Sequence, residues 1–446
     1  MSADGPAEPR VDRAGPGDVL LLATDVGPAP MNIGAVLVLG HGTSAAVLRG
    51  LLAERITAIP RLRQRLHRPP PGCGRPYWAD DPGFDAGRHI RELPCPPPGD
   101  EQALLAAAAA VAREPLPRQR PLWAARVVTG LAGGGSGLVI VMHHVLADGI
   151  GGLAVLAGLV DGAASGAPPR PFPAAPPPAR TLAADAWTAR LHGLRRPGSF
   201  LRTLRQGFTE LAGQQWPGRV PRSSLNQPTT ARRRVDVVAA DLGPIRDLAH
   251  AHGGTVNDVV LAAVAGAIRE LLAGRGERLS LLRVSVPVSG RPAAAGGQLG
   301  NQVGVIPVGL PTGGSLPGRL DRVAAVTRQR KTAAPGTSAA LLGPAFRLLA
   351  ATGIFRWYIN RQRLVHTFVT NLRGPAEQLT LGGAPVLAII PVTQTAGNVP
   401  VTFAVLSYAG VLRISVITDP VRAPDAGRLV TALRAELAGA LPAEAG

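Results

Sequence analysis

A proline-rich segment near the middle of the chain limits what this sequence can fold into. Residues 163–180 contain seven prolines, a density that neither a regular helix nor a central strand tolerates. Strand-like and helix-like patterns occur on both sides of it. We therefore expect two domains that each mix strands and helices, at residues 1–165 and 233–446, joined by a proline-rich and basic helical connection at residues 166–232.

Local patterns predict the main elements of both domains. Residues 31–40 are rich in β-branched and apolar side chains and predict a strand. A helix is expected at 44–55, where a serine can cap its first turn. Residues 122–128 and 137–144 predict two strands joined by a glycine-rich turn, and residues 255–272 predict a long apolar helix.

The composition excludes several classes of protein. Hydrophobic residues make up 46% of the chain, which is too many for wholesale disorder. The chain has two cysteines, Cys73 and Cys95, so it is not a disulfide scaffold, and a reducing cytoplasm is the expected compartment. Its first eighteen residues contain no apolar core, and no apolar run reaches the roughly 20 residues of a membrane-spanning helix.

The formal net charge of +18 raises the question of an anionic partner. Lys331 is the single lysine among 47 cationic residues, a pattern typical of a GC-rich coding bias. Half of the excess lies between residues 187 and 234, where ten arginines face one acid, Glu210. This segment suits phosphate or anionic lipid. No zinc-finger, homeodomain or RNA-binding pattern accompanies it, so we expect no nucleic-acid partner.

One heptad at the end of an apolar strand carries recognisable chemistry: His143, His144, Val-Leu-Ala, Asp148 and Gly149. Side chains alternate along a strand, so one histidine is expected to face the domain body and the other a substrate channel. A neutral imidazole in such a channel can accept a proton at neutral pH. Asp148 could orient the loop by pairing with an arginine. Gly149 permits a turn that a side chain would block.

Other site chemistries find less support in the sequence. A metal site needs three or four convergent ligands, and the two cysteines are far from the histidine pair in sequence, so no metal site is predicted. The glycine-rich run at residues 133–137 precedes a strand, which indicates a turn rather than the nucleophile elbow of a serine hydrolase. No phosphate-binding glycine loop follows a strand. A buried histidine pair that caps a strand remains the structural alternative.

The heptad resembles the HHxxxDG signature of CoA-dependent acyltransferases. Over nearly its full length the chain resembles the bacterial wax ester synthase/acyl-CoA:diacylglycerol acyltransferase family. Residues 121–123 are similar to that family's PLW motif, residues 257–258 to its ND motif, and residues 370–375 to its Asn-Val-Pro-Gly-Pro motif. Leu-Gly-Asn at residues 299–301 also fits the family pattern.

This resemblance implies an α/β (α+β) fold of two chloramphenicol-acetyltransferase-like domains with a substrate channel at their interface. It implies an O-acyltransferase that moves a long-chain acyl group from acyl-CoA to diacylglycerol or a fatty alcohol, with His144 as general base. No cofactor is expected, since acyl-CoA is a co-substrate. His143, Asp148 and Gly149 would shape the catalytic loop. The substrate-binding residues that it implies are Pro121, Leu122, Trp123, Asn257, Asp258 and Asn371.

The accessory motifs also have structural interpretations. Trp123 lies in an alternating strand, which suits a core residue, and Thr255 with Asp258 spells a helix capping box. Asn371 fits a turn that ends a strand. The sequence also departs from the family pattern at four positions, which concern the acceptor pocket and substrate choice: Asn32, Pro117, Leu372 and Arg373.

Long-chain products partition into lipid, so the resemblance implies a cytoplasmic enzyme that associates peripherally with a membrane or lipid inclusions. The basic segment and the amphipathic run at residues 355–363 are the expected contacts. The oligomeric state is left open. Three alternatives stand beside this interpretation: a condensation-type enzyme that acts on a carrier-protein thioester, a glycolipid- or polyketide-tailoring acyltransferase, and a catalytically idle lipid-inclusion protein.

Overall fold

A computed structural model describes residues 11–163, 171–194, 219–289, 303–331, 348–350 and 352–440. Two features singled out in the sequence lie outside these ranges: the Leu-Gly-Asn motif at residues 299–301 and the central part of the basic segment, residues 195–218.

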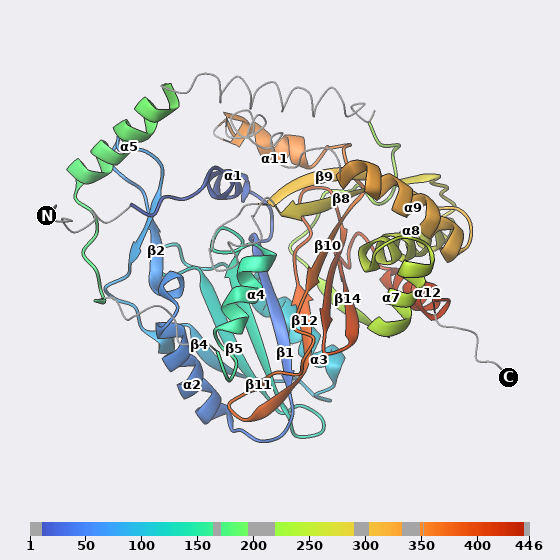
Figure 1. The fold of residues 1–446 in the computed structure, drawn as a ribbon, viewed down its shortest axis with the longest axis horizontal. Coiled ribbons are helices and arrows are strands. Elements are labelled where there is room, and N and C mark those ends of the chain that lie inside the picture. Colours follow the sequence, from blue (N-terminus) through green and yellow to red (C-terminus); the bar gives the residue numbers. More distant parts are fainter. Residues whose placement is uncertain are drawn as a thin grey trace, which may run out of the picture.

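Two six-stranded mixed sheets form the framework of the molecule (Figure 1). The first sheet has the order β11-β12-β1-β6-β5-β4. β2 and β3 form a separate two-stranded sheet. The bounds of these strands are β1 Asn32–Leu39, β2 Gln64–His67, β3 Tyr77–Asp80, β4 Ile90–Pro94, β5 Trp123–Thr129, β6 Ser136–His143, β11 Thr380–Leu381 and β12 Ala384–Val392.

The second sheet has the order β7-β14-β13-β10-β8-β9 and comes from the C-terminal half of the chain. In its centre β10 runs parallel to both β13 and β8, whereas the other neighbours are antiparallel. Its strands are β7 Arg234–Asp241, β8 Leu281–Ser289, β9 Val303–Pro311, β10 Thr367–Arg373, β13 Val401–Tyr408 and β14 Val411–Thr418.

Helices pack against both sheets (Figure 1). Their bounds are α1 Pro16–Thr24, α2 Ala45–Thr57, α3 Glu101–Arg113, α4 Gly149–Ala157, α5 Ala179–Leu194, α7 Leu242–Ala251, α8 Val256–Gly274, α9 Leu316–Lys331, α11 Ile354–Ile359 and α12 Ala426–Ala438. In the described part of the chain, none of these helices combines the length and the apolar character that a bilayer crossing requires.

The predicted strands at residues 31–40, 122–128 and 137–144 are confirmed as β1, β5 and β6. The helices follow from local chemistry as well. The Ser44 hydroxyl accepts a hydrogen bond from the Val47 amide at the start of α2, and the Asp100 carboxylate does the same for the Ala103 amide at the start of α3. The apolar helix α8 is buried on nearly all sides, because the second sheet, α7, α9 and α12 pack around it.

One strand of the C-terminal half crosses into the first sheet. β12 pairs antiparallel with β1, from Gly34 opposite Val392 to Leu39 opposite Val386. β1 in turn pairs with β6, so that Asn32 lies opposite His143. The first sheet is therefore completed by residues 380–392, which follow most of the second sheet in sequence. The apolar residues at 387–392 predict a strand there, and only the fold shows which sheet it joins.

The two halves share a hydrophobic core. Helix α3 lies between the sheets and contacts β1, β6, β7 and β12. Its Leu104 and Leu105 pack in one cluster with Val141 of β6, Ile390 of β12 and Val237 of β7. Because these side chains from both halves are buried together, the hydrophobic effect holds the halves in one relative position.

Asp161 clamps the β11–β12 turn to the first half. Its carboxylate accepts hydrogen bonds from the amides of Gly382 and Gly383 at 3.0 and 2.9 Å and from the Arg55 guanidinium at 2.5 Å. Burial alone would raise the pKa of Asp161, but these three donors outweigh it and hold the pKa well below its usual value. The crossing strand is thus fixed by side chains at its start and by the β1 ladder along its length.

Replacing Asp161 with Ala should loosen this turn first. The variant leaves the amides of Gly382 and Gly383 without their acceptor, so we expect faster hydrogen exchange at both and a loss of about 1 kcal/mol in the free energy of unfolding. Mass-spectrometric hydrogen exchange of a peptide spanning residues 378–390 measures the first effect. Glu54→Ala, at an exposed position on α2, is the matched control. Unchanged exchange in Asp161→Ala would show that the ladder alone fixes the strand.

Candidate functional site

The histidine pair ends the central strand of the first sheet. β6 lies between β1 and β5, and the side chains from Gly137 to His143 are buried. The backbone of the pair is fixed by its neighbours, because the His143 amide donates to Leu122 O at 2.9 Å and the His144 amide to Met31 O at 2.8 Å. This anchoring places two consecutive side chains on opposite sides of a rigid strand end, as the alternation predicts.

His143 faces the domain body and is held from both sides of its ring. Nδ1 accepts a hydrogen bond from the Val145 amide at 3.1 Å, so Nε2 carries the proton and donates it to Asp25 Oδ2 at 3.2 Å. The ring is almost fully buried. Because both ring nitrogens form hydrogen bonds within the protein, His143 fixes the turn after β6.

Asp25 was not found by sequence analysis. It follows α1, and nothing in the local sequence connects it with a histidine more than a hundred residues away. Burial alone would raise its pKa, but the hydrogen bond from His143, the Met31 amide at 3.1 Å and the Arg118 guanidinium at 3.3 Å outweigh burial and lower the pKa of the carboxyl group. Asp25 therefore stays ionised and supports the buried imidazole.

His144 faces the opposite way and lines a pocket of about 100 Å³. Burial lowers the pKa of the His144 imidazole below its ordinary value of 6.5, against a smaller opposing effect of the nearby Asp148 charge. The imidazole is therefore neutral at physiological pH and able to accept a proton. Among the described residues that line the pocket, His144 is the single ionisable side chain.

The turn between the histidines and α4 is shaped by Asp148 and Gly149. Asp148 is buried and caps α4, since its carboxylate accepts a hydrogen bond from the Gly151 amide at 2.9 Å. Gly149 begins the helix and lines the pocket. A Cβ there would stand 2.9 Å from the Leu372 side chain of β10, so the need for glycine comes from close packing between the halves.

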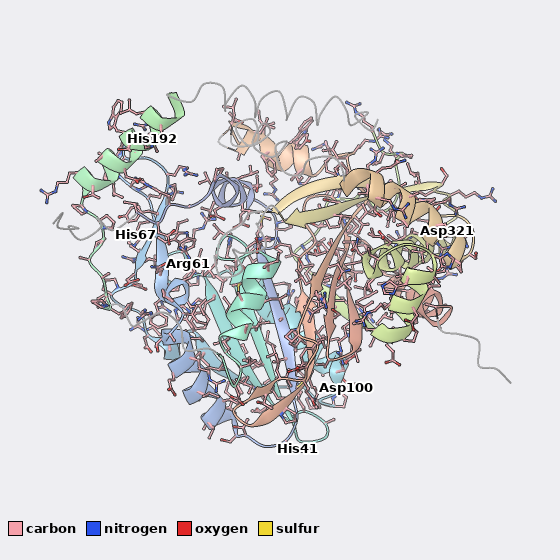
Figure 2. The ribbon with its side chains drawn as sticks, in the orientation of Figure 1. His41, Arg61, His67, Asp100, His192 and Asp321 are labelled. Carbon is pink, nitrogen blue, oxygen red and sulfur yellow. The ribbon has the colours of Figure 1, made fainter. Side chains whose placement is uncertain are left out.

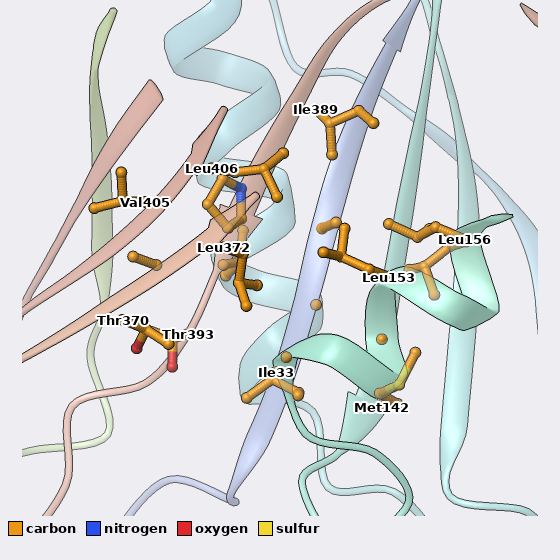
Figure 3. Close-up of a pocket in the computed structure, with 18 of the residues that line it drawn as sticks. Ile33, Met142, Leu153, Leu156, Thr370, Leu372, Ile389, Thr393, Val405 and Leu406 are labelled. Atoms are coloured by element: carbon orange, nitrogen blue, oxygen red, sulfur yellow. The ribbon is translucent and has the colours of Figure 1, made fainter. Parts of the chain in front are cut away.

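The pocket lies between the two halves of the molecule (Figure 3). One wall comes from β1, β6 and α4, and the other from β10, β12 and β13. Leu153 and Leu156 of α4 lie on one side in Figure 3, and Thr370 and Thr393 on the other, with their hydroxyls turned the same way. At Gly152, which also lines the pocket, an added Cβ would meet only open space. The pocket is apolar with three polar side chains: His144, Thr370 and Thr393.

The PLW residues, 121–123, support the site through their contacts with β6. Trp123 is buried, donates from Nε1 to Leu62 O at 2.7 Å and stacks on His89 with ring centroids 4.4 Å apart. It lies opposite Met142 in the ladder, and Leu122 O receives the His143 amide. None of residues 121–123 lines the pocket. Their contacts fix β6 and hence the histidines, which agrees with the structural interpretation of Trp123.

The two asparagines of separate motifs come together. Asn371 of β10 donates from Nδ2 to Asn257 Oδ1 at the start of α8, at 3.2 Å. Asp258 is buried beside them, with one oxygen accepting from the Thr255 amide and hydroxyl and the other from the Thr327 hydroxyl. The expected capping box is thus present. Asn257, Asp258 and Asn371 do not line the pocket, whereas Thr370 and Leu372, on either side of Asn371, do.

The described residues contain no group of three or more His, Cys, Asp and Glu side chains arranged as metal ligands would be. Cys73 and Cys95 are free and buried.

Comparisons with known proteins show the family to which the chain is similar. The model of the wax ester synthase/diacylglycerol acyltransferase catalytic domain matches residues 15–260, and that of the C-terminal domain of the same family matches residues 299–439. A probable diacylglycerol O-acyltransferase of Mycobacterium tuberculosis is 32% identical over 422 residues, covering 90% of this chain and 89% of that protein. A second protein of that organism, a putative diacylglycerol O-acyltransferase, is 29% identical over 458 residues, covering 96% of this chain and 97% of that one.

Solved structures show the same fold. The wax ester synthase/diacylglycerol acyltransferase of Marinobacter aquaeolei superposes with a TM-score of 0.69 at 23% identity, covering 96% of this chain and 98% of that one. The starter condensation domain of rhizomide synthetase, in complex with C8-CoA, superposes with a TM-score of 0.63 at 16% identity, covering 96% of this chain and 95% of that one. These likenesses confirm the expected mixed α/β fold of two chloramphenicol-acetyltransferase-like domains.

Replacing Asp25 with Asn tests its support of His143. The variant keeps the shape and removes the charge, so we expect the free energy of unfolding to fall by about 1–2 kcal/mol at pH 7. The folded pKa of Asp25 lies below its unfolded value, so this contribution is present above about pH 4 and is lost as the pH falls through the folded pKa. Denaturant unfolding from pH 7 to pH 3 measures it. Asp247→Asn, exposed on α7, is the control. A gap between wild type and Asp25→Asn that stays constant across this range would contradict the assignment.

Proposed function

The chain belongs to the wax ester synthase/diacylglycerol acyltransferase family, and we propose that His144 is the general base with which it moves a long-chain acyl group from acyl-CoA to an alcohol. The acceptor is diacylglycerol, a fatty alcohol or both, which gives triacylglycerol or wax ester. The observation that carries this proposal is the apolar pocket between the halves, in which His144 is the single ionisable side chain among the described lining residues.

The proposed reaction is a direct transfer. The neutral His144 imidazole takes the proton of the acceptor hydroxyl, and the alcohol oxygen attacks the thioester carbonyl carbon to form a tetrahedral oxyanion. The carbon–sulfur bond then breaks, CoA leaves as its thiolate, and the imidazolium returns the proton to sulfur. Every proton is accounted for without an acyl-enzyme, and the steps need neither a cofactor nor a metal ion.

The oxyanion needs hydrogen-bond donors near the pocket. Thr370 of β10 and Thr393 after β12 supply the two hydroxyls that face the pocket from the C-terminal half. Thr370 lies in β10 of the second sheet, and Thr393 directly follows β12 of the first sheet, so both positions are fixed before substrate binds. Such preorganised donors stabilise a developing negative charge more than water does. We propose that one or both of these hydroxyls bind the oxyanion.

The remaining residues of the heptad are proposed to position the base. His143 and Asp25 fix the turn after β6, Asp148 fixes the start of α4, and Gly149 lets β10 approach closely. Trp123 then acts through the backbone of β5 and β6, and Asn257 and Asn371 act through the contact between α8 and β10, rather than by touching substrate.

Replacing His144 with Ala should lower kcat by about 10²-fold or more while leaving the unfolding midpoint unchanged. The measurement is CoA release from labelled palmitoyl-CoA with dioleoylglycerol or hexadecanol, followed by separation of the lipid products. His41→Ala, at the exposed turn labelled in Figure 2, is the control. Because burial lowers the pKa of His144, the acid limb of kcat/KM should have its midpoint below pH 6.5. Near-normal turnover in His144→Ala would contradict the base assignment.

We propose that the enzyme works at the cytoplasmic surface of a membrane or lipid inclusion. Two exposed tryptophans support this, Trp187 on α5 and Trp357 on α11, with 60% and 59% of their surface exposed. Arg190 lies over the Trp187 ring and Arg361 over the Trp357 ring. Both helices lie along the upper edge of the molecule in Figure 1. Exposed tryptophans next to arginines are typical of surfaces that enter the headgroup region of an anionic membrane.

The double variant Trp187→Ala/Trp357→Ala should lose most of its binding to anionic liposomes. Flotation with vesicles of phosphatidylglycerol and phosphatidylcholine at increasing salt measures this, and binding by wild type should weaken as salt screens the arginines. Val421→Ala, which removes an exposed apolar side chain elsewhere, is the control. If the double variant floats as wild type does, another surface makes the contact.

A further inference from the structure

Three glycines are among the described residues that line the pocket: Gly34, Gly149 and Gly152. Packing explains the first two. A Cβ at Gly34 would stand 2.2 Å from Ile140 O, and a Cβ at Gly149 would stand 2.9 Å from the Leu372 side chain. Any larger residue at these two positions would collide with its neighbours, so both glycines are accounted for without a substrate.

Gly152 has no such explanation. No atom outside its own helix and chain neighbours lies within 4 Å of the place that its Cβ would occupy, and its backbone belongs to the regular helix α4. Glycine is less favourable than alanine inside a helix, because it loses more backbone freedom on folding. The chain therefore has a less stable residue at a position where packing would admit a side chain.

The open space beside Gly152 belongs to the pocket. Gly149, Gly152, Leu153 and Leu156 all line the pocket, and their spacing of three and four residues places them on one face of α4. Leu153 and Leu156 lie together on one side of the pocket in Figure 3. A side chain added at Gly152 would therefore extend from this face into the pocket.

The pocket runs from His144 into the apolar core of the first sheet. Ile140, which also lines it, lies four residues before His144 along the chain, a span of about 13 Å in a strand. Along α4, Gly152 lies about 5 Å beyond Gly149, and Leu156 about 10 Å beyond it. The end of the pocket away from His144 is formed by buried apolar side chains: Ile140, Leu156, Ile389 and Leu406.

We propose that Gly152 sets the length of the alkyl chain that the enzyme accepts, an inference that rests on the proposed function. A chain whose reacting end lies at His144 passes Gly152 before it reaches the apolar end of the pocket. A side chain at position 152 would take the room of its methylenes. The acyl thioester and the acceptor alcohol both carry an alkyl chain, and the experiment below separates these two sources.

The experiment measures kcat/KM for wild type, Gly152→Ala and Gly152→Leu over two series of substrates. The first series runs from butyryl-CoA to palmitoyl-CoA with hexadecanol, and the second from butanol to hexadecanol with butyryl-CoA. Each methylene that is kept out of an apolar pocket lowers binding about fourfold. In at least one series, the ratio of kcat/KM for the longest chain to that for the shortest should therefore fall about fourfold in Gly152→Ala and tenfold or more in Gly152→Leu. The series that responds identifies the chain in the pocket.

Gly50→Ala and Gly50→Leu are the matched controls. Gly50 also lies inside a helix, α2, and has nothing within 4 Å of its Cβ position, but it is exposed and does not line the pocket. Both alanine variants should raise the unfolding midpoint by about 2 °C, because alanine favours a helix. The chain-length ratio should change in the Gly152 variants and stay as in wild type in the Gly50 variants.

Two results would overturn the proposal. A lower unfolding midpoint in Gly152→Ala would show that packing requires this glycine, as it does at Gly149. Unchanged ratios in both Gly152 variants would show that no alkyl chain uses the space beside it.

Fatty-acid binding keeps this proposal separate from the function proposed above, because it needs no turnover. Displacement of cis-parinaric acid, a fluorescent fatty acid, is measured with saturated acids from butyric to hexadecanoic. If wild type transfers no acyl group to any alcohol, the proposed function fails, while a lost preference for hexadecanoic acid in Gly152→Leu still supports the role of Gly152. If wild type transfers acyl groups but neither the ratios nor the fatty-acid preference change in the Gly152 variants, only the role of Gly152 is wrong.

Discussion

The antiparallel pairing of β12 with β1 is the interaction on which the rest of the molecule depends. It brings a strand of the C-terminal half against the strand that neighbours β6, and so brings Thr393 into the pocket that His144 lines. The two strands pair from Gly34 to Leu39 of β1, with one register shift between Val38 and Leu39. The shared core around α3 buries apolar side chains from both sheets. The pocket between the halves is therefore part of one packed structure, and its walls do not need a ligand to meet.

The sequence predicts many of the elements, and the strand that ends in the histidine pair, because their signals are local. Apolar and β-branched residues indicate β1, β5 and β6, and Ser44 and Thr255 mark helix starts by their capping chemistry. The two faces of the histidine pair also follow from strand geometry alone. What local patterns cannot predict is the partner of a strand or of a buried charge. The place of β12 in the first sheet and the contact of Asp25 with His143 depend on chain segments far apart in sequence.

The motif residues divide into those that line the pocket and those that hold it. His144 and Gly149 line the pocket. The polar atoms of Trp123 and Asp258 form hydrogen bonds with the backbone or with neighbouring side chains instead. Asn257 and Asn371 join α8 to β10. A sequence motif does not show whether its residue lines the pocket or supports other residues that line it. Here Thr370 and Leu372, on either side of Asn371, line the pocket, whereas Asn371 does not.

The crossing strand also has a consequence for the order in which the chain is made. During synthesis, the first sheet lacks its β12 neighbour until residue 392 has left the ribosome, long after β1 and β6 have emerged. Until then, the outer edge of β1 presents unpaired backbone groups and apolar side chains, a template to which another chain can add. The nascent first half therefore keeps an open edge until β12, which follows β7, β8, β9 and β10 in sequence, has been made.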